Sequence, residues 1–172
     1  MLTKLKMVMI AGAVAIVINT FILYAADWIP LVTAHGGLLK LIKPAASGFF
    51  QAFGIAAVWD KAGMPGSESA IFQLGFHVIV GLGMAVFYAF IVEPYLPYAA
   101  WVNGLIYALV VWLANAFVVL PLIGEGFAGN RNLSMTGMGY YAIAHTIFFV
   151  LLATIYASLR ESRLDQMRAQ RS

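Results

Sequence analysis

Residues 70–92 read AIFQLGFHVIVGLGMAVFYAFIV, and this run contains no charged side chain. About 20 consecutive apolar residues match the roughly 30 Å hydrocarbon thickness of a bilayer, so the run predicts a transmembrane helix. His77 lies in the first third of it. Hydrocarbon tolerates an imidazole only where the ring faces a partner, a cavity or a cofactor, so the surroundings of His77 decide what this protein does.

The composition of the whole chain is typical of a membrane protein. Of its 172 residues, 63% are hydrophobic and only 10% are charged, whereas soluble domains carry roughly 25% charged residues. The sequence contains no cysteine, which excludes disulfides, thiolate metal sites and thiol redox chemistry. The net charge of +3 is small and much of the positive charge lies near the two ends, so nothing indicates binding to nucleic acid.

Four segments reach spanning length and predict an all-α, polytopic membrane protein with a single domain over residues 1–172. The predicted transmembrane helices cover residues 7–26, 70–92, 99–123 and 137–159. Four spans in sequence make an up-down-up-down bundle. The first of them follows Lys4 and Lys6 and is long enough to span, so we interpret it as a retained helix rather than a cleaved signal peptide.

Basic residues at both ends predict the orientation of the bundle. Lys4 and Lys6 precede the first span, and a tail at residues 160–172 carries four arginines after the last one. Because positive charge is retained on the cytoplasmic side, both termini and this tail are expected in the cytoplasm. The connections at residues 27–69 and 124–136 then face outward.

The first outer connection contains a second apolar region, at about residues 36–59. Its longest uninterrupted part, residues 45–59, is too short to span comfortably, and it fits better as a re-entrant or interfacial segment. A tilted fifth span is the alternative, but it would place the arginine-rich tail outside, against the charge rule.

Two of the predicted spans carry a histidine at nearly the same depth. His77 follows Ser67 by ten positions and His145 follows Ser134 by eleven, and serine commonly caps the N-terminus of a helix. The second and fourth spans run in the same direction and rise about 1.5 Å per residue. The two imidazoles are therefore expected at one height.

The other two spans each carry an asparagine at a comparable depth. Asn19 lies eight positions before Asp27, and Asn115 lies eight positions before Ile123. Both are thus roughly 12 Å inside the outer boundary, which places one strongly polar side chain from every span in a single layer. The other candidate site residues share helical faces with these four or lie beside them: Gln73, Gly81, Trp112 and Tyr141.

Several hypotheses account for this polar layer. The simplest is hydrogen bonding between helices, which contributes about 0.6 kcal/mol per contact in membranes. His77 and His145 could instead be the two axial ligands of a b-type haem, or the layer could bind a quinone or another small apolar molecule. A bound copper or other metal on the two histidines, assisted by Met84 or Met138, is a further alternative.

Two classes of function therefore stay open. In the first, the chain is a non-enzymatic accessory subunit that packs in the bilayer against other membrane subunits or further copies of itself. In the second, it is an electron-transfer or ligand-binding membrane protein that uses His77 and His145. The acidic residues all lie outside the predicted spans, so neither a hydrolase nor a carboxylate-gated pump is favoured.

Three short motifs resemble those of small bacterial inner-membrane proteins of the YagU-like type. They are His77-x-x-x-Gly81, the sequence VVLPLIG that ends at Gly124 after Trp112, and His145 in the last span. The resemblance covers roughly the second to fourth spans and implies a four-helix protein of the bacterial inner (cytoplasmic) membrane. That family carries no established reaction.

Overall fold

The computed structural model describes residues 2–26, 28–29, 58, 61–63, 69–122, 126–131 and 133–170. Over these residues the chain is helical, without strands, and four helices are long and apolar enough to cross a membrane. This confirms the predicted all-α class and the number of candidate spans. The predicted re-entrant or interfacial segment at residues 36–59 lies outside the described residues, except for Val58.

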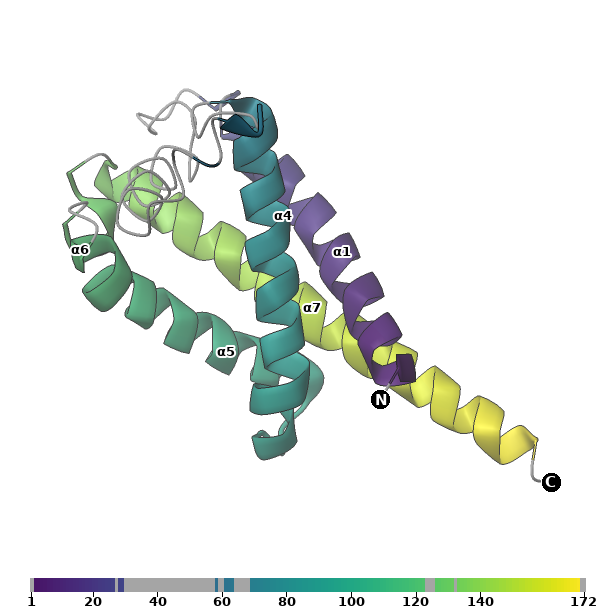
Figure 1. The fold of residues 1–172 in the computed structure, drawn as a ribbon. Helices are drawn as coiled ribbons and strands as arrows, with labels where there is room; N and C mark the ends of the chain where they lie inside the picture. The colour runs from purple at the N-terminus through teal and green to yellow at the C-terminus, as the bar shows by residue number, and fades with distance from the viewer. Residues whose placement is uncertain are drawn as a thin grey trace.

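The elements follow one another as α-helices interrupted by short π and 3₁₀ turns (Figure 1). In chain order they are α1 (Leu2–Ala25), α4 (Ala70–Phe87), the π-helix η1 (Tyr88–Val92), the 3₁₀ turn η2 (Glu93–Tyr95), α5 (Ala100–Ala114), the π-helix η3 (Asn115–Val119), α6 (Leu120–Leu122), the 3₁₀ turn η4 (Phe127–Gly129) and α7 (Met135–Ala169). The helices long and apolar enough to span are Thr3–Ala25, Ala70–Tyr95, Ala100–Leu122 and Met135–Ala169. Compared with the predicted spans, the first begins four residues earlier, the second ends three later, the third is one residue shorter at each end, and the fourth ends ten later.

Serine caps begin two of these helices, one where predicted and one not. Ser134 Oγ accepts a hydrogen bond from the Gly137 N–H at 3.1 Å, which confirms this residue as the N-cap of α7. The prediction of Ser67 for α4 was wrong, because Ser69 fills that position and accepts from the Phe72 N–H at 3.2 Å. A serine at either position can cap a helix, and sequence alone does not choose between them.

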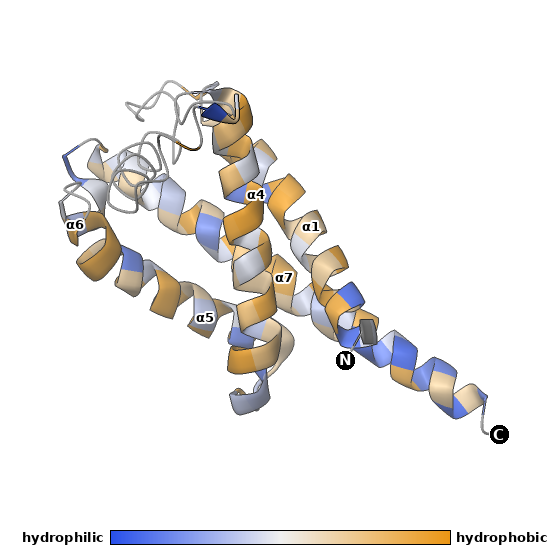
Figure 2. Ribbon diagram, viewed as in Figure 1, coloured by the Kyte–Doolittle hydropathy of each residue, from blue (hydrophilic) through white to orange (hydrophobic). Residues whose placement is uncertain are grey.

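Helix α7 is the longest element, and it continues through most of the predicted C-terminal tail. It runs for 35 residues and contacts both α1 and α5, while α4 packs mainly against α1. Figure 2 shows orange, apolar residues over most of the spans and blue, polar residues concentrated at the C-terminal end of α7. The tail at residues 160–169 is therefore a helical extension beyond the packed helices.

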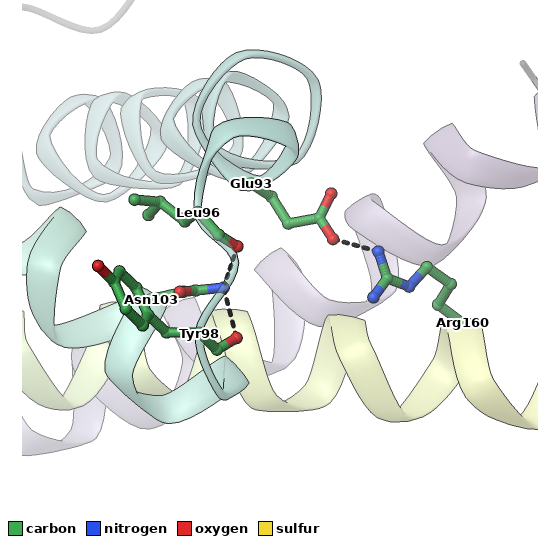
Figure 3. A network of polar contacts seen from close by, with 5 residues as sticks. All are labelled: Glu93, Leu96, Tyr98, Asn103 and Arg160. Atoms are coloured by element: carbon green, nitrogen blue, oxygen red, sulfur yellow. Dashed lines mark hydrogen bonds and ion pairs between the residues drawn. The ribbon is translucent and has the colours of Figure 1, made fainter.

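Two charged contacts and a polar turn lie at one end of the molecule, and Figure 3 shows the ion pair and the turn. Arg160 of α7 forms an ion pair with Glu93, and Lys4 of α1 lies 4.8 Å from the centre of the Phe90 ring. The turn between η2 and α5 is held by Asn103, whose Nδ2 donates to the carbonyl oxygens of residues 96 and 98 at 3.1 Å each.

The hydrophobic core occupies the half of the helices adjoining this end, which we call the packed half. Its largest fully buried side chains are Val8, Tyr88, Phe149, Leu152 and Tyr156. In this half the helices approach closely through small residues. A Cβ on Gly104 of α5 would lie 2.7 Å from the Val150 Cα of α7, and a Cβ on Gly12 would lie 2.8 Å from the Ala85 Cβ. The opposite half, which we call the hollow half, contains the site.

Candidate functional site

The hollow half encloses a cavity of about 310 Å³ between α1, α4, α5, η3 and α7. The turn η4 and Leu133, which precede α7, line the cavity as well. Most of the lining is apolar, with a small number of polar groups. A cavity of this volume and character lies at the lower end of the range for small-molecule sites.

All four polar residues of the predicted layer line this one cavity: Asn19 from α1, His77 from α4, Asn115 from η3 and His145 from α7. Measured from the observed cap Ser69, His77 is eight positions into its helix, whereas His145 is eleven positions beyond Ser134. Because no measurement places the two caps at one level, the equal height of the two imidazoles stays a prediction. The two imidazoles nevertheless share one cavity.

Three further predicted residues, Gly81, Trp112 and Tyr141, also line the cavity. Gln73 lies on the first turn of α4, and its side chain falls outside what the structure describes. Met84 and Met138, named as possible metal ligands, line the cavity too. The remaining lining residues were not predicted: Ile16, Phe76, Val80, Ala116, Val119, Leu120, Ala128, Leu133, Phe148 and Phe149.

Asn19 joins two helices. Its side chain is 3% exposed, and Nδ2 donates to the Ala144 carbonyl oxygen of α7 at 2.8 Å. Nearby, the hydroxyl of Tyr140 on α7 donates to the Ile22 carbonyl oxygen of α1. Asn19 therefore has the role of an interhelical hydrogen bond, the simplest of the hypotheses for this layer.

Gly81 also serves helix packing. A Cβ added to it would lie 2.7 Å from Cγ1 of Ile16 on α1. The space that a side chain would fill is thus already taken by α1, which lets α4 approach that helix at the edge of the cavity. This contact gives Gly81 no separate surface on which a flat cofactor could pack.

His145 is oriented by a hydrogen bond within its own helix. Its Nδ1 lies 2.9 Å from the carbonyl oxygen of Tyr141. A carbonyl oxygen only accepts, so the imidazole carries its proton on Nδ1 and donates it there. The other nitrogen, Nε2, is the one left for a ligand, as in many histidines that a second hydrogen bond orients.

His77 carries a buried ring nitrogen in the cavity wall for which the described residues provide no hydrogen-bond partner. Its Nε2 is buried and makes no hydrogen bond with any part of the chain that the structure describes. An unpaired buried donor or acceptor costs roughly 1–3 kcal/mol, so each such group in a folded protein calls for an explanation. A bound molecule with a polar atom at this nitrogen would provide the partner.

Two irregular backbone segments shape the cavity, and sequence reasoning identified neither. Asn115 and Ala116, which both line the cavity, begin the π-helix η3, and π turns occur frequently at functional sites. In η4, Ala128 has a positive φ of 51° and its side chain lines the cavity. The two glycines on either side, Gly126 and Gly129, were the only signal in the sequence for this turn.

Among the described residues that line the cavity, His77 and His145 are the two imidazole ligands that a metal could use. Among the described residues there is no group of three or more His, Cys, Asp or Glu side chains that could hold a metal ion. Met84 and Met138 do line the cavity. Each lies seven residues from the histidine of its own helix, roughly 10 Å along the axis, so neither can share one ion with that histidine.

Comparison with protein-family models, with curated proteins and with solved structures finds no match for this chain. The proposed function is therefore based on the residues that line the cavity.

Proposed function

We propose that this chain is an integral membrane protein that binds a small, mostly apolar ring molecule of the quinone type in the hollow half. The observation that carries the proposal is the buried, unpartnered Nε2 of His77 in the wall of an apolar cavity of about 310 Å³. Ligand sites have this character, with apolar walls and a few polar groups that orient the molecule.

The shape of the site favours a single ring over a macrocycle. The volume lies at the lower end of the range for ligand pockets, and Ile16 occupies the space beside Gly81, so a flat macrocycle cannot pack against the backbone there. The b-type haem with His77 and His145 as axial ligands is therefore our second choice of cofactor. The same cavity residues serve either ligand.

The test is to purify the full chain gently from its native membrane, extract it with organic solvent and identify small molecules by mass spectrometry. We expect a ring compound near one equivalent per chain. Ala116→Leu, which places three extra carbons at the cavity, should lower the recovered amount at least tenfold. Ala114→Leu is the matched control, because Ala114 lies two positions before Ala116, is exposed and does not line the cavity, so this variant should keep full recovery.

Two outcomes would contradict this proposal. Sharp b-type haem bands in a reduced-minus-oxidised spectrum would replace the ring compound by haem. A flat spectrum together with an empty extract would leave the cavity without a ligand and would favour the accessory-subunit hypothesis.

A second candidate function, an accessory subunit of a larger membrane complex, is supported by the outer surface of α4. A Cβ on Gly75 or Gly83 would meet no atom within 4 Å, and such small residues allow another helix to pack closely. Gentle purification distinguishes the two, because a lone monomer that never copurifies with a partner would count against the subunit.

The location and orientation of the chain are part of the same proposal. Lys4, the ion-paired Arg160 and the charged end of α7 all lie at one end, which supports a cytoplasmic position for both termini under the positive-inside rule. The bacterial inner membrane, and kinship with the YagU-like proteins, rest on the three short motifs alone.

A further inference from the structure

We propose that the ligand carries a hydroxyl group that donates to Nε2 of His145, so that the cavity prefers a hydroquinone or phenol to the corresponding quinone. This inference rests on the proposed function and specifies the oxidation state of the ring. It follows from which atoms of the site can donate a hydrogen bond and which can only accept one.

The starting point is the hydrogen bond between Nδ1 of His145 and the Tyr141 carbonyl oxygen, at 2.9 Å. Because the carbonyl supplies no proton, the imidazole must donate from Nδ1. A neutral imidazole has one N–H, so its Nε2 presents a lone pair. Toward a ligand in the cavity, His145 is then an acceptor.

The charge on the ring follows from its surroundings. The described residues that line the cavity include no carboxylate that could balance an imidazolium. An unbalanced charge is costly at membrane depth and in apolar surroundings. The neutral ring, with the lone pair on Nε2, is therefore the form that meets the ligand.

A quinone and a hydroquinone differ in the group that they present to Nε2 of His145. The quinone presents a carbonyl oxygen, so that two acceptors would face each other and no hydrogen bond would form. The hydroquinone presents a hydroxyl, whose proton can be donated to Nε2. The site therefore gains one hydrogen bond with the reduced ring that it lacks with the oxidised ring.

The second histidine is compatible with the same choice. Nε2 of His77 is buried and has no partner among the described residues, and none of its described contacts selects one tautomer. A hydroxyl can both donate and accept, so it satisfies either tautomer of His77, whereas a carbonyl satisfies only one. The Asn115 amide in the cavity wall offers both a donor and an acceptor and does not disturb this preference.

Aromatic side chains in the wall suit a ring-shaped ligand. Trp112, Phe76 and Phe149 line the cavity, and aromatic rings pack favourably in stacked or edge-to-face pairs. They bind the oxidised and reduced rings alike, so the discrimination between the two falls on the histidines.

The test compares three probes built on the same tetramethyl ring, measured anaerobically against the full chain in lipid nanodiscs. They are durohydroquinone, duroquinone and durohydroquinone dimethyl ether, which has ether oxygens but no proton to donate. We expect durohydroquinone to bind roughly 3- to 10-fold more tightly than either of the others, the range for one neutral hydrogen bond.

Replacing His145 tests whether its Nε2 lone pair causes the preference for durohydroquinone. His145→Phe should lower the affinity for durohydroquinone to that for duroquinone. Ile143→Phe is the matched control on the same helix, since Ile143 is 62% exposed and should leave the preference unchanged. Thermal unfolding of both variants in detergent shows that each remains folded.

The outcomes separate this inference from the proposed function. Equal binding of the three probes, tighter binding of duroquinone, or a preference that survives His145→Phe would overturn the inference while leaving a ring-binding site. Failure of all three probes to bind, with an empty solvent extract, would overturn the proposed function and the inference with it.

Discussion

The same four helices pack closely against one another in one half of this molecule and surround a cavity in the other half. In the packed half, Tyr107 lies with its ring centre 4.6 Å from that of Phe149 and 5.4 Å from that of Tyr88, and its hydroxyl donates to the Met84 carbonyl oxygen at 3.2 Å. In the hollow half, the helices enclose a cavity instead, and a histidine nitrogen in its wall has no described partner. Of the two arrangements, the second leaves a space that a ligand could occupy.

The difference separates a half that packs for stability from a half that we propose binds a ligand. Between helices in a bilayer, association depends on close packing and hydrogen bonds, because lipid is as apolar as the side chains. A void forfeits the dispersion contacts of the atoms that line it. A cavity of about 310 Å³ beside a well-packed core is thus a cost that a bound molecule would remove.

The largest effect is expected where α5 meets α7 in the packed half. Gly104→Ala would place a Cβ 2.7 Å from the Val150 Cα and 2.8 Å from the Phe149 carbonyl oxygen, and backbone atoms cannot rotate away. We expect the free energy of unfolding in detergent to fall by about 1–3 kcal/mol, as for other overpacked sites.

The control for this substitution is Gly83→Ala on α4, where an added Cβ meets no atom within 4 Å. Alanine favours a helix over glycine by up to about 1 kcal/mol, so this variant should be as stable as the parent or more so. If both variants lost stability equally, close approach at Gly104 would not be what holds α5 to α7.

A smaller effect is expected from Asn19, at the edge of the cavity. Asn19→Leu removes the hydrogen bond to the Ala144 carbonyl oxygen while keeping a similar volume. Loss of one interhelical hydrogen bond in a membrane should lower the unfolding free energy by about 0.6–2 kcal/mol, measured by the same detergent titration.

Thr20→Val is the matched control for Asn19→Leu. Among the described residues, the Thr20 hydroxyl bonds only to the Ile16 carbonyl oxygen of its own helix, so its removal should change stability little. A larger loss at Thr20 than at Asn19 would show that the contact between α1 and α7 does not depend on the asparagine.

The four spans and the depth of their polar residues could be predicted from the sequence. Apolar length identified four spans, and counting residues from their ends brought Asn19, His77, Asn115 and His145 to one layer, because depth follows from a constant rise per residue. All four do line one cavity. Whether they bind a ligand there stays a prediction.

The remaining features depend on what each residue faces. Gly83 and Gly104 are both single glycines within apolar helices. A Cβ added to Gly83 would lie in open space, whereas one added to Gly104 would contact the backbone of α7. Likewise, Asn19 is engaged with α7 while His77 Nε2 has no described partner, although both are single polar residues in apolar runs. These differences depend on which atoms of a neighbouring helix each residue meets. The residue pattern along one helix does not predict those contacts.

The smallest effect is expected at the ion pair that closes the packed half (Figure 3). Arg160 and Glu93 join α7 to the turn after α4, with side chains 46% and 15% exposed. Partly exposed pairs contribute little, so a double-mutant cycle with Glu93→Gln and Arg160→Gln should give a coupling free energy of about 0.2–1 kcal/mol. The pair of Arg168 and Asp165, 3.6 Å apart and 81% and 75% exposed, is the control and should give less.

This cycle also tests the separation of the two halves. Because the ion pair lies at the far end from the cavity, neither single variant should change the affinity for durohydroquinone. A shift of more than about twofold would mean that contacts at the packed end set the geometry of the hollow half. Binding and stability would then be coupled through α7, which contributes Arg160 at one end and His145 at the other.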